Sequence, residues 1–249
     1  MPRKQISAFI SENKRFFPYH TVIPMDYIRY LNESFDYTKE ALWGRWVRWL
    51  LLLIASILFP FIYGYSVRVI SGTKPAPEPE GWIGLFIDGI KVIIISLVYT
   101  IPVYVLAAVS LLAYFIPVSS TTTPAGTSSS GLLSPELGIV VALALLVLFI
   151  VAIIVCGILA TFGVARFSRT GRMGDAFRIG TLRDHIGRIG WLDVFIALVV
   201  LTVVFAIAEF VLMFIPVIGW FLLFLLTPAF VIFASRYIAL VYESAPAPA

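Results

Sequence analysis

Charged residues are scarce in this sequence: Asp, Glu, Lys and Arg make up 13% of its 249 residues. Soluble domains carry about 25% charged residues, so the chain falls well outside their range. Hydrophobic residues make up 60%, and the mean hydropathy is +0.98. The composition therefore predicts an integral membrane protein whose main solvent is lipid.

Cysteine and histidine are nearly absent. The single cysteine, Cys156, excludes disulfide bonds and thiolate metal sites within one chain. The two histidines, His20 and His185, lie far apart in the sequence and make a poor inventory for a metal site. We also find no glycine-rich phosphate loop, no cluster of histidines and carboxylates, and no nucleophile beside a recognisable base. We therefore expect no metal, no cofactor and no catalytic residues, and a protein that is not an enzyme.

We also expect no cleavable signal peptide, because residues 1–40 lack the apolar core that such a peptide requires. The net charge of +4 is modest, and the basic residues flank apolar runs instead of forming a separate basic domain. This pattern argues against nucleic acid as a partner. Anionic lipid headgroups fit the positive balance better.

Arginine is concentrated in residues 165–190, a short polar connection between the apolar runs 137–164 and 194–215. Moving guanidinium groups across a bilayer is costly, so an arginine-rich loop between apolar segments marks the cytoplasmic side. A second group, of aromatic and basic residues, stands where the chain first enters the membrane. From both groups we expect contacts with anionic lipid or an acidic partner: Arg166, Arg169, Arg172, Arg178, Arg183 and Arg188 in the loop, and Trp43, Arg45, Trp46 and Arg48 at the entry.

The apolar runs predict an all-α polytopic helix bundle with four full transmembrane helices, at about residues 92–116, 137–164, 194–215 and 220–235. They belong to a single membrane domain, residues 43–243, between a polar juxtamembrane segment, 1–42, and a short tail, 244–249. The neutral Ser/Thr-rich loop 118–134 is expected to be external and flexible. The N-terminus and residues 165–190 are expected in the cytoplasm.

Residues 49–67 form a further apolar segment, uncharged for 19 residues but interrupted by Pro60. Its length is barely enough for one span of about 30 Å. If it crosses fully, eight Lys and Arg lie opposite the other ten; if it turns back at Phe59–Pro60–Phe61, all 18 lie on one side. The asymmetry favours a re-entrant hairpin, with a fifth span as the alternative. Just before it, Trp43, Trp46 and Trp49 recur at spacing three, which predicts one helical face in the headgroup layer.

Two stretches outside these segments have helical periodicity. Residues 26–40 predict a short cytoplasmic helix near the membrane, with a disordered tail as the alternative. A helix that starts near Gly174 would carry a polar face with His185, which we expect to be solvated. We expect it to lie flat on the inner membrane surface through an apolar face made of Ile179, Leu182, Ile186 and Ile189.

Smaller patterns within the membrane domain concern pairing and packing. Asp88 and Lys91 stand at spacing three near the entrance of the span 92–116, where they can form an ion pair. Ala152, Cys156 and Ala160 recur every four residues and make a smooth stripe that another helix can approach closely. Cys156 is therefore assigned to packing and not to redox or ligand chemistry.

Glu209 is an ionisable residue within the expected span 194–215. It lies 16 residues after Asp193, about 24 Å along a helix, which predicts a position toward the outer interface. An ionisable group in a span is a functional hypothesis by default. Two roles stay open, a hydrated or hydrogen-bonded structural carboxylate and a group that acts in transport, proton transfer or ligand contact.

Several short motifs resemble a known family: Gly64-Tyr65 with Arg68-Val69-Ile70, Trp82 with Leu85-Phe86 and Asp88-Gly89-Ile90-Lys91, and Ala165-Arg166-Phe167 with Asp175-Ala176-Phe177. Together they resemble the archaeal multi-pass membrane proteins grouped as domain-of-unknown-function family 4013. The resemblance implies a prokaryotic, mostly archaeal, plasma-membrane protein. It carries no established activity and no catalytic residues.

Two functional hypotheses follow. The first is a non-enzymatic scaffold or accessory subunit that binds membrane lipids, another membrane protein complex or a second copy of itself. The second is a small transporter or channel with Glu209 near the pathway, suggested also by the prolines Pro60, Pro102 and Pro228 within apolar segments. A hydrated path would need several hydroxyls to converge, and the spans offer few: Ser96, Thr100, Thr161, Thr202 and Thr227.

Overall fold

The computed structural model describes residues 25–115, 120–123, 126–129, 135–215 and 218–245. This part of the chain is almost wholly helical, with the elements α2 (Tyr27–Leu42), α3 (Trp46–Ile57), α4 (Phe59–Ile70), α5 (Trp82–Phe115), β1 (Ser120–Thr123), β2 (Gly126–Ser129), α6 (Pro135–Thr170), η1 (Met173–Phe177), α7 (Ile179–Ile189), α8 (Trp191–Met213) and α9 (Ile218–Glu243). Four helices, α5, α6, α8 and α9, are long and apolar enough to span a membrane. The predicted fold class is therefore confirmed.

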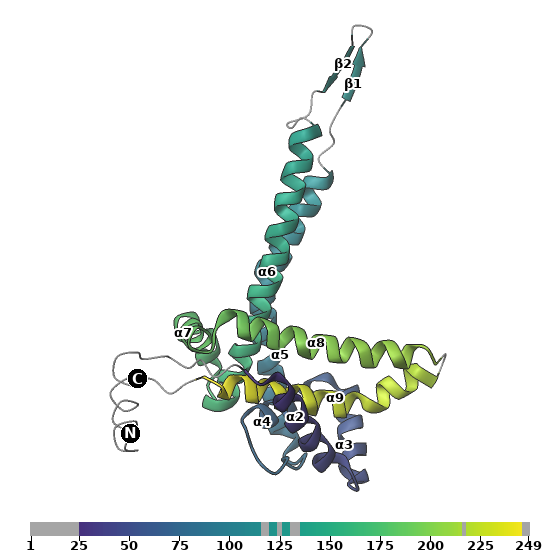
Figure 1. Ribbon diagram of the computed structural model, residues 1–249, viewed down its shortest axis with the longest axis vertical. Helices are drawn as coiled ribbons and strands as arrows, with labels where there is room; N and C mark the ends of the chain where they lie inside the picture. The colour runs from purple at the N-terminus through teal and green to yellow at the C-terminus, as the bar shows by residue number, and fades with distance from the viewer. Residues whose placement is uncertain (1–24, 116–119, 124–125, 130–134, 216–217, 246–249) are drawn as a thin grey trace, which may run out of the picture.

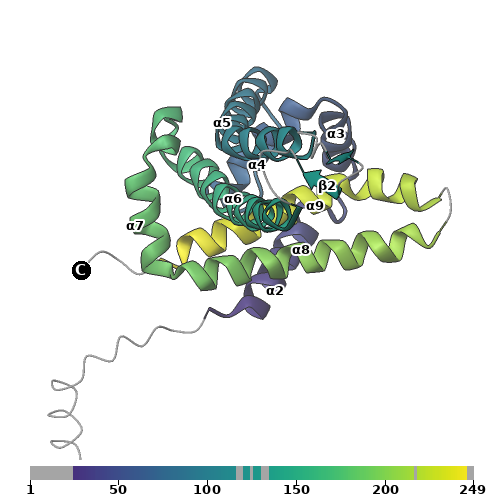
Figure 2. The same ribbon diagram turned by 90° about the horizontal axis from the view of Figure 1, so that it is seen from above.

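The long helices form two antiparallel pairs that leave a common body in different directions. The pair α5–α6 rises from the body and carries the short antiparallel ribbon β1–β2 at its tip (Figure 1). The pair α8–α9 lies across the base of α5–α6 (Figures 1 and 2). The loop that was expected to be only flexible thus contains a ribbon. The position of Glu209 toward the outer interface stays a prediction.

The core sits in the body, where the bases of the long helices meet α2, α4, η1 and α7. Its larger cluster includes the fully buried side chains of Ile95, Phe162 and Leu182. A smaller cluster is centred on Leu52 and Tyr65. By contrast, none of the most apolar stretch of α6 is buried within the chain. The fold is therefore held together in the body, and α6 extends from it without a protein shell.

The apolar segment 49–67 is broken into the two helices α3 and α4. The break is at Leu58, whose φ of −100° and ψ of 85° are not helical, one residue before the expected bend. Each helix has 12 residues, a length of about 18 Å, which is too short to cross a hydrocarbon core of about 30 Å. Phe61 N donates to Leu58 O at 2.9 Å, so part of the broken ladder is restored at the turn.

Both ends of this hairpin reach the same loop, residues 71–81. At the start of α3, Arg48 pairs with Glu78, and near the end of α4, Tyr65 Oη donates to Pro77 O at 2.9 Å. The two ends therefore lie on one side of the protein. This geometry fits the re-entrant hairpin and not a fifth span.

Two glycines bring α4 and α5 into backbone contact. A Cβ added at Gly64 would lie 1.8 Å from Leu85 O, and one at Gly89 would lie 1.6 Å from Pro60 O. Because neither backbone can yield while its helix persists, only glycine allows this approach. Both glycines belong to the short motifs singled out in the sequence, which gives those motifs a physical reason.

The three tryptophans near the membrane entry do not share one helical face, as their spacing had suggested. Trp43 ends α2, and Gly44, with a φ of 74°, turns the chain before α3 begins. Trp46 and Trp49 do stack, with ring centroids 5.7 Å apart. Trp49 Nε1 donates to Leu225 O at 2.9 Å and so fixes α3 to α9. Trp43 and Trp46 are left exposed.

The two amphipathic stretches are both helices of the body. The N-terminal one is α2, capped by Asp26, whose carboxylate accepts from Arg29 N at 2.9 Å. The central one is α7, but Leu182 and Ile186 are fully buried in the core, whereas Ile179 is exposed. Most of the apolar face of α7 is therefore covered by protein and not by lipid.

We expect the contact between α4 and α5 to be intolerant of a single methyl group. Gly64→Ala and Gly89→Ala should each lower stability by about 3 kcal/mol, since the helices must move apart. Gly157→Ala on α6 is the matched control, because nothing lies within 4 Å of the added Cβ. The control should be neutral or slightly stabilising, as alanine favours helix. Thermal unfolding in detergent measures the stability of the variants and of the control. Equal midpoints for Gly64→Ala and Gly157→Ala would contradict the backbone contact between α4 and α5.

Candidate functional site

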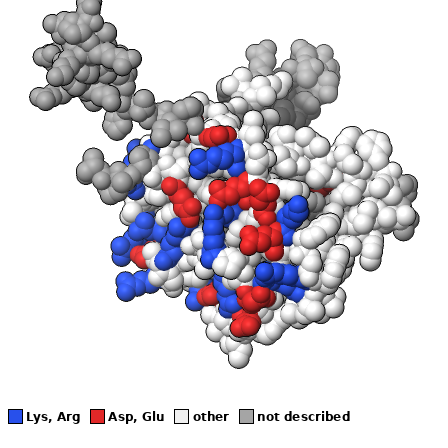
Figure 3. All heavy atoms as spheres, turned by 60° about the horizontal axis from the view of Figure 1, so that its bottom comes forward, with Lys and Arg blue, Asp and Glu red and all other residues white. Residues whose placement is uncertain are grey.

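Charged side chains gather on one face of the body, which we call the polar face. Figure 3 shows this face, with basic and acidic groups interspersed and the surroundings uncharged. Residues 92–135 and 137–165, which include most of α5 and α6, contain no Lys, Arg, Asp or Glu. The one-sided distribution agrees with the charge counting from sequence.

A buried arginine joins the two ends of the chain on this face. Arg236 of α9 is only 2% exposed, and its Nη2 lies 2.6 Å from Glu33 Oε1 of α2. Lys74 Nζ lies 2.7 Å from the same oxygen, and the Tyr37 ring lies 5.2 Å from the guanidinium. Hydrogen bonds from Lys74 and Arg236 hold the pKa of Glu33 below its usual range. The sequence marked Arg236 only as the end of a span, because nothing local signals a partner 203 positions away.

A second ion pair closes the base of the hairpin. Arg48 is 4% exposed, donates through Nε to Glu78 Oε2 at 3.0 Å, and also donates through Nη1 to Ala41 O at 3.0 Å. The hydrogen bond from Arg48 holds the pKa of Glu78 below its usual range. Arg48 therefore uses its donors inside the protein. Arg45, 3.5 Å from Glu78, stays half exposed on the surface.

The arginines of residues 165–190 fall into an inner and an outer group. Arg169 lies 2.7 Å from Glu243 and over the Tyr242 ring, and Arg166 Nε is buried without a hydrogen bond among the described residues. The outer group lies exposed in the segment that runs from the end of α6 through α7, and consists of Arg172, Arg178, Arg183 and Arg188. Within it, Arg178 pairs with Asp175 at 3.0 Å.

The charge of the whole chain resides in this segment. Residues 165–190 hold six arginines and two aspartates, Asp175 and Asp184, a net charge of +4. That equals the net charge of the full chain, so the remaining 12 basic and 12 acidic residues balance. The segment therefore concentrates net positive charge at one edge of the polar face, although Arg178 pairs with Asp175 within it.

His185 was expected on a solvated face, but it is partly buried and packs against Tyr242. Its Nε2 lies 3.0 Å from Tyr242 O, and its ring stacks on the Tyr242 ring with centroids 4.2 Å apart. Burial lowers the pKa of His185, against the opposing effect of the Tyr242 carbonyl. The imidazole is therefore neutral near pH 7 and fixes α7 to the end of α9.

The other residues that the sequence analysis singled out lie apart from one another. Lys91 Nζ lies 2.9 Å from Asp88 Oδ1 and 5.5 Å from the centre of the Phe167 ring. Glu209 lines a groove between α8 and α9. The small residues of α6, Ala152, Cys156 and Ala160, are all half-buried on the helix that packs along α5.

The described part of the chain shows no candidate metal site. No group of three or more His, Cys, Asp or Glu side chains converges there in a way that could hold an ion. The hydroxyls of Thr100, Thr161 and Thr202 donate to carbonyls four residues earlier in their own helices. The donor of each of these hydroxyls is therefore used within its own helix.

We expect the Glu33–Arg236 pair to stabilise the fold. Glu33→Gln leaves a buried guanidinium without its counter-charge and should cost about 2 kcal/mol, less than a fully buried pair because Glu33 is partly exposed. Glu40→Gln on the same helix removes an equal but exposed charge and should cost little. Since the pKa of Glu33 is lowered on folding, this stabilisation is present above pH 4.5, the usual value, and is lost as pH falls below it. Thermal unfolding between pH 7 and pH 3 measures both, and equal midpoints for the two variants would refute the role of the pair.

The comparisons with known proteins return one family. The family described as protein of unknown function (DUF4013) matches residues 49–217, from the re-entrant hairpin through α8. Neither the comparison with curated proteins nor that with solved structures found a match. Because the match covers more than half of the chain and agrees with the resemblance seen in the sequence, the chain belongs to the DUF4013 family of proteins of unknown function.

Proposed function

We propose that this protein is a non-enzymatic membrane scaffold or accessory subunit that binds anionic lipid headgroups through the outer arginines of residues 165–190. One observation carries the proposal: this segment holds the entire net positive charge of the chain and exposes Arg172 and Arg183. Anionic leaflets attract clusters of arginine next to apolar helices. In this proposal the polar face is turned to the cytoplasm.

The apolar surface supports a scaffold role. The most apolar stretch of α6 buries none of its residues in the chain, and those of α5 and α8 bury 17%. Side chains such as Leu143, Val147 and Ile150 are about half exposed or more. Surfaces of this kind are covered by lipid or by helices of other membrane proteins, since both can make van der Waals contacts with apolar side chains. The protein therefore offers a broad docking surface in the membrane and a charged one beside it.

A small transporter or channel is the second candidate. The observation that favours it is the groove between α8 and α9, lined by Glu209 and Thr227. However, the Thr227 hydroxyl donates to Leu223 O in its own helix, like the other threonines of the long helices. A path for polar solutes would need free polar groups along it, so the scaffold is the better supported function.

We expect binding of anionic lipid to depend on the outer arginines and on salt. The double variant Arg172→Gln/Arg183→Gln should weaken binding of phosphatidylglycerol by about tenfold or more, since each charge near the surface contributes about 1 kcal/mol. The measurement is the ratio of phosphatidylglycerol to phosphatidylcholine retained by protein purified from mixed micelles. Raising the salt concentration should lower this ratio for the wild type, because screening weakens exposed charges.

The matched control is Arg29→Gln/Lys39→Gln, which removes two exposed charges from α2, a helix with no excess of basic residues because it also carries Glu33, Asp36 and Glu40. It should retain phosphatidylglycerol almost as the wild type does. Equal loss in both double variants would show that total charge matters and not this segment. Retention that is unaffected by salt and by Arg172→Gln/Arg183→Gln would reject the proposal.

A further inference from the structure

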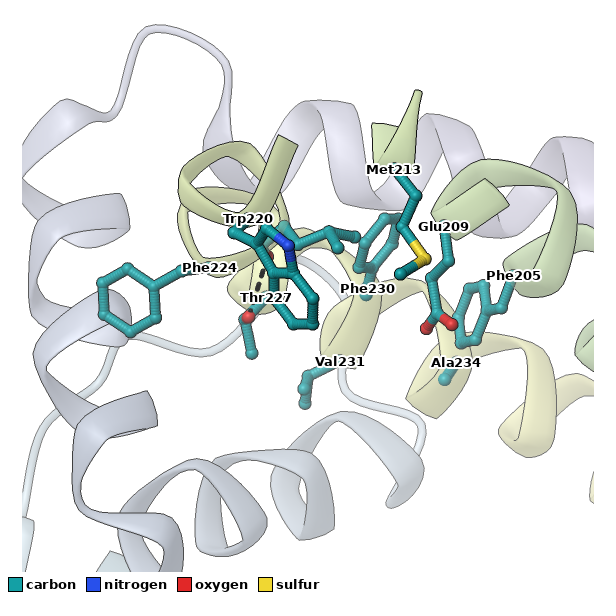
Figure 4. Close-up of a pocket in the computed structure, with 10 residues that line it drawn as sticks. Phe205, Glu209, Met213, Trp220, Phe224, Thr227, Phe230, Val231 and Ala234 are labelled. Carbon is teal, nitrogen blue, oxygen red and sulfur yellow. Dashed lines mark hydrogen bonds between the residues drawn. The ribbon is translucent and has the colours of Figure 1, made fainter. Parts of the chain in front are cut away.

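The groove between α8 and α9 has the size of a small-molecule site. Its volume is about 750 Å³, within the range of about 300 to 1,000 Å³ that ligand pockets occupy. The lining is mainly aromatic and aliphatic (Figure 4). From α8 it takes Phe205, Glu209 and Met213, which recur every four residues, and from α9 it takes Trp220, Leu223, Phe224, Thr227, Phe230, Val231 and Ala234.

The groove is bounded at both ends by contacts between the two helices. At the far end, a Cβ on Gly219 would lie 2.0 Å from Leu212 O, so the backbones touch there. Toward the body, the Phe205 ring packs against Phe230 and Phe233, with centroids 5.4 and 5.8 Å away. The space between is therefore held open by the fold and does not need a ligand to form.

Glu209 is the one charged residue in residues 194–235, which contain no Lys, Arg or His. Its carboxylate is directed toward α9, near Phe205 and Ala234 (Figure 4). It forms no ion pair or hydrogen bond with the residues that the structure describes. Its side chain is exposed along the groove, and a carboxylate exposed among apolar helices of a membrane is costly unless a positive charge or a donor meets it. The described residues therefore supply no counter-charge to Glu209 in the groove.

The residues that line the groove favour one class of ligand that could supply a positive charge to Glu209. Aromatic faces attract organic cations within about 6 Å of the ring centre, and one carboxylate adds a full negative charge. A hard metal ion would need about six oxygen ligands, which a lining with a single carboxylate cannot provide. An anion would find no basic group. The apolar walls favour bulky hydrophobic substituents around the charge.

We propose that the groove between α8 and α9 binds a lipophilic organic cation, with Glu209 as counter-charge and Phe205, Trp220 and Phe230 as aromatic walls. This site is separate from the outer arginines and independent of their binding to lipid headgroups. One carboxylate among aromatic side chains suits a compact cation with apolar substituents.

The test uses a pair of probes with one shape and opposite charge, tetraphenylphosphonium and tetraphenylborate, with the full chain in nanodiscs. Equilibrium dialysis should show saturable binding of the phosphonium at one site per chain and no saturable binding of the borate. Glu209→Gln should weaken phosphonium binding at least tenfold. Glu40→Gln, which removes a carboxylate on α2, should leave it unchanged and control for total charge.

Val231→Trp provides a second variant that keeps Glu209 and fills the groove. It should abolish phosphonium binding while both variants elute from size exclusion as the wild type does. Phosphonium binding that is non-saturable in the wild type, equal for the two probes, or unchanged in Glu209→Gln or in Val231→Trp would overturn the proposal. A membrane protein that copurifies with the wild type and is lost in Glu209→Gln, without phosphonium binding, would instead assign the groove to a partner's basic side chain.

Discussion

The ion pair between Arg236 and Glu33 is the interaction on which the body of this protein depends. A guanidinium that is 2% exposed is tolerated only with a counter-charge in place, and α2 supplies it from 203 positions away. The same carboxylate holds Lys74 of the loop 71–81. That loop, through Glu78, closes the base of the re-entrant hairpin. One buried charge thus ties the N-terminal helix, the last helix and the hairpin into a single unit, from which the apolar pairs extend.

Length and charge asymmetry were enough to predict most of the architecture. The long apolar runs predicted the four long helices, and Pro60 together with one-sided counting of basic residues predicted the hairpin. The pairs that stabilise it could not be predicted, because Arg48 finds Glu78 only after two segments pack together. The same holds for Gly64 and Gly89, whose purpose is visible only when α4 and α5 lie backbone to backbone. A single sequence shows which residues are small or charged. Which residue each of them contacts is decided by the fold.

Helix α7 illustrates a general limit of periodicity. An apolar face at helical spacing shows that something must cover that face, and lipid and protein satisfy the pattern equally well. Here Leu182 and Ile186 are covered by the core, and His185, on what was expected to be a solvated face, packs on Tyr242. The consequence is that the arginines of α7 are held on a rigid support. Their positions relative to the apolar helices are therefore fixed by the core and not by the membrane.

The crossing of the two helix pairs sets the environment of Glu209. Because α8 and α9 cross the base of α5–α6, Glu209 lies on a pair of helices that leaves the body in a different direction from α5–α6 (Figure 1). Glu209 is the one charged residue among those that line the groove, and the other lining residues are mainly aromatic or aliphatic. That combination, one carboxylate and mainly apolar walls, is what binding of a lipophilic cation requires.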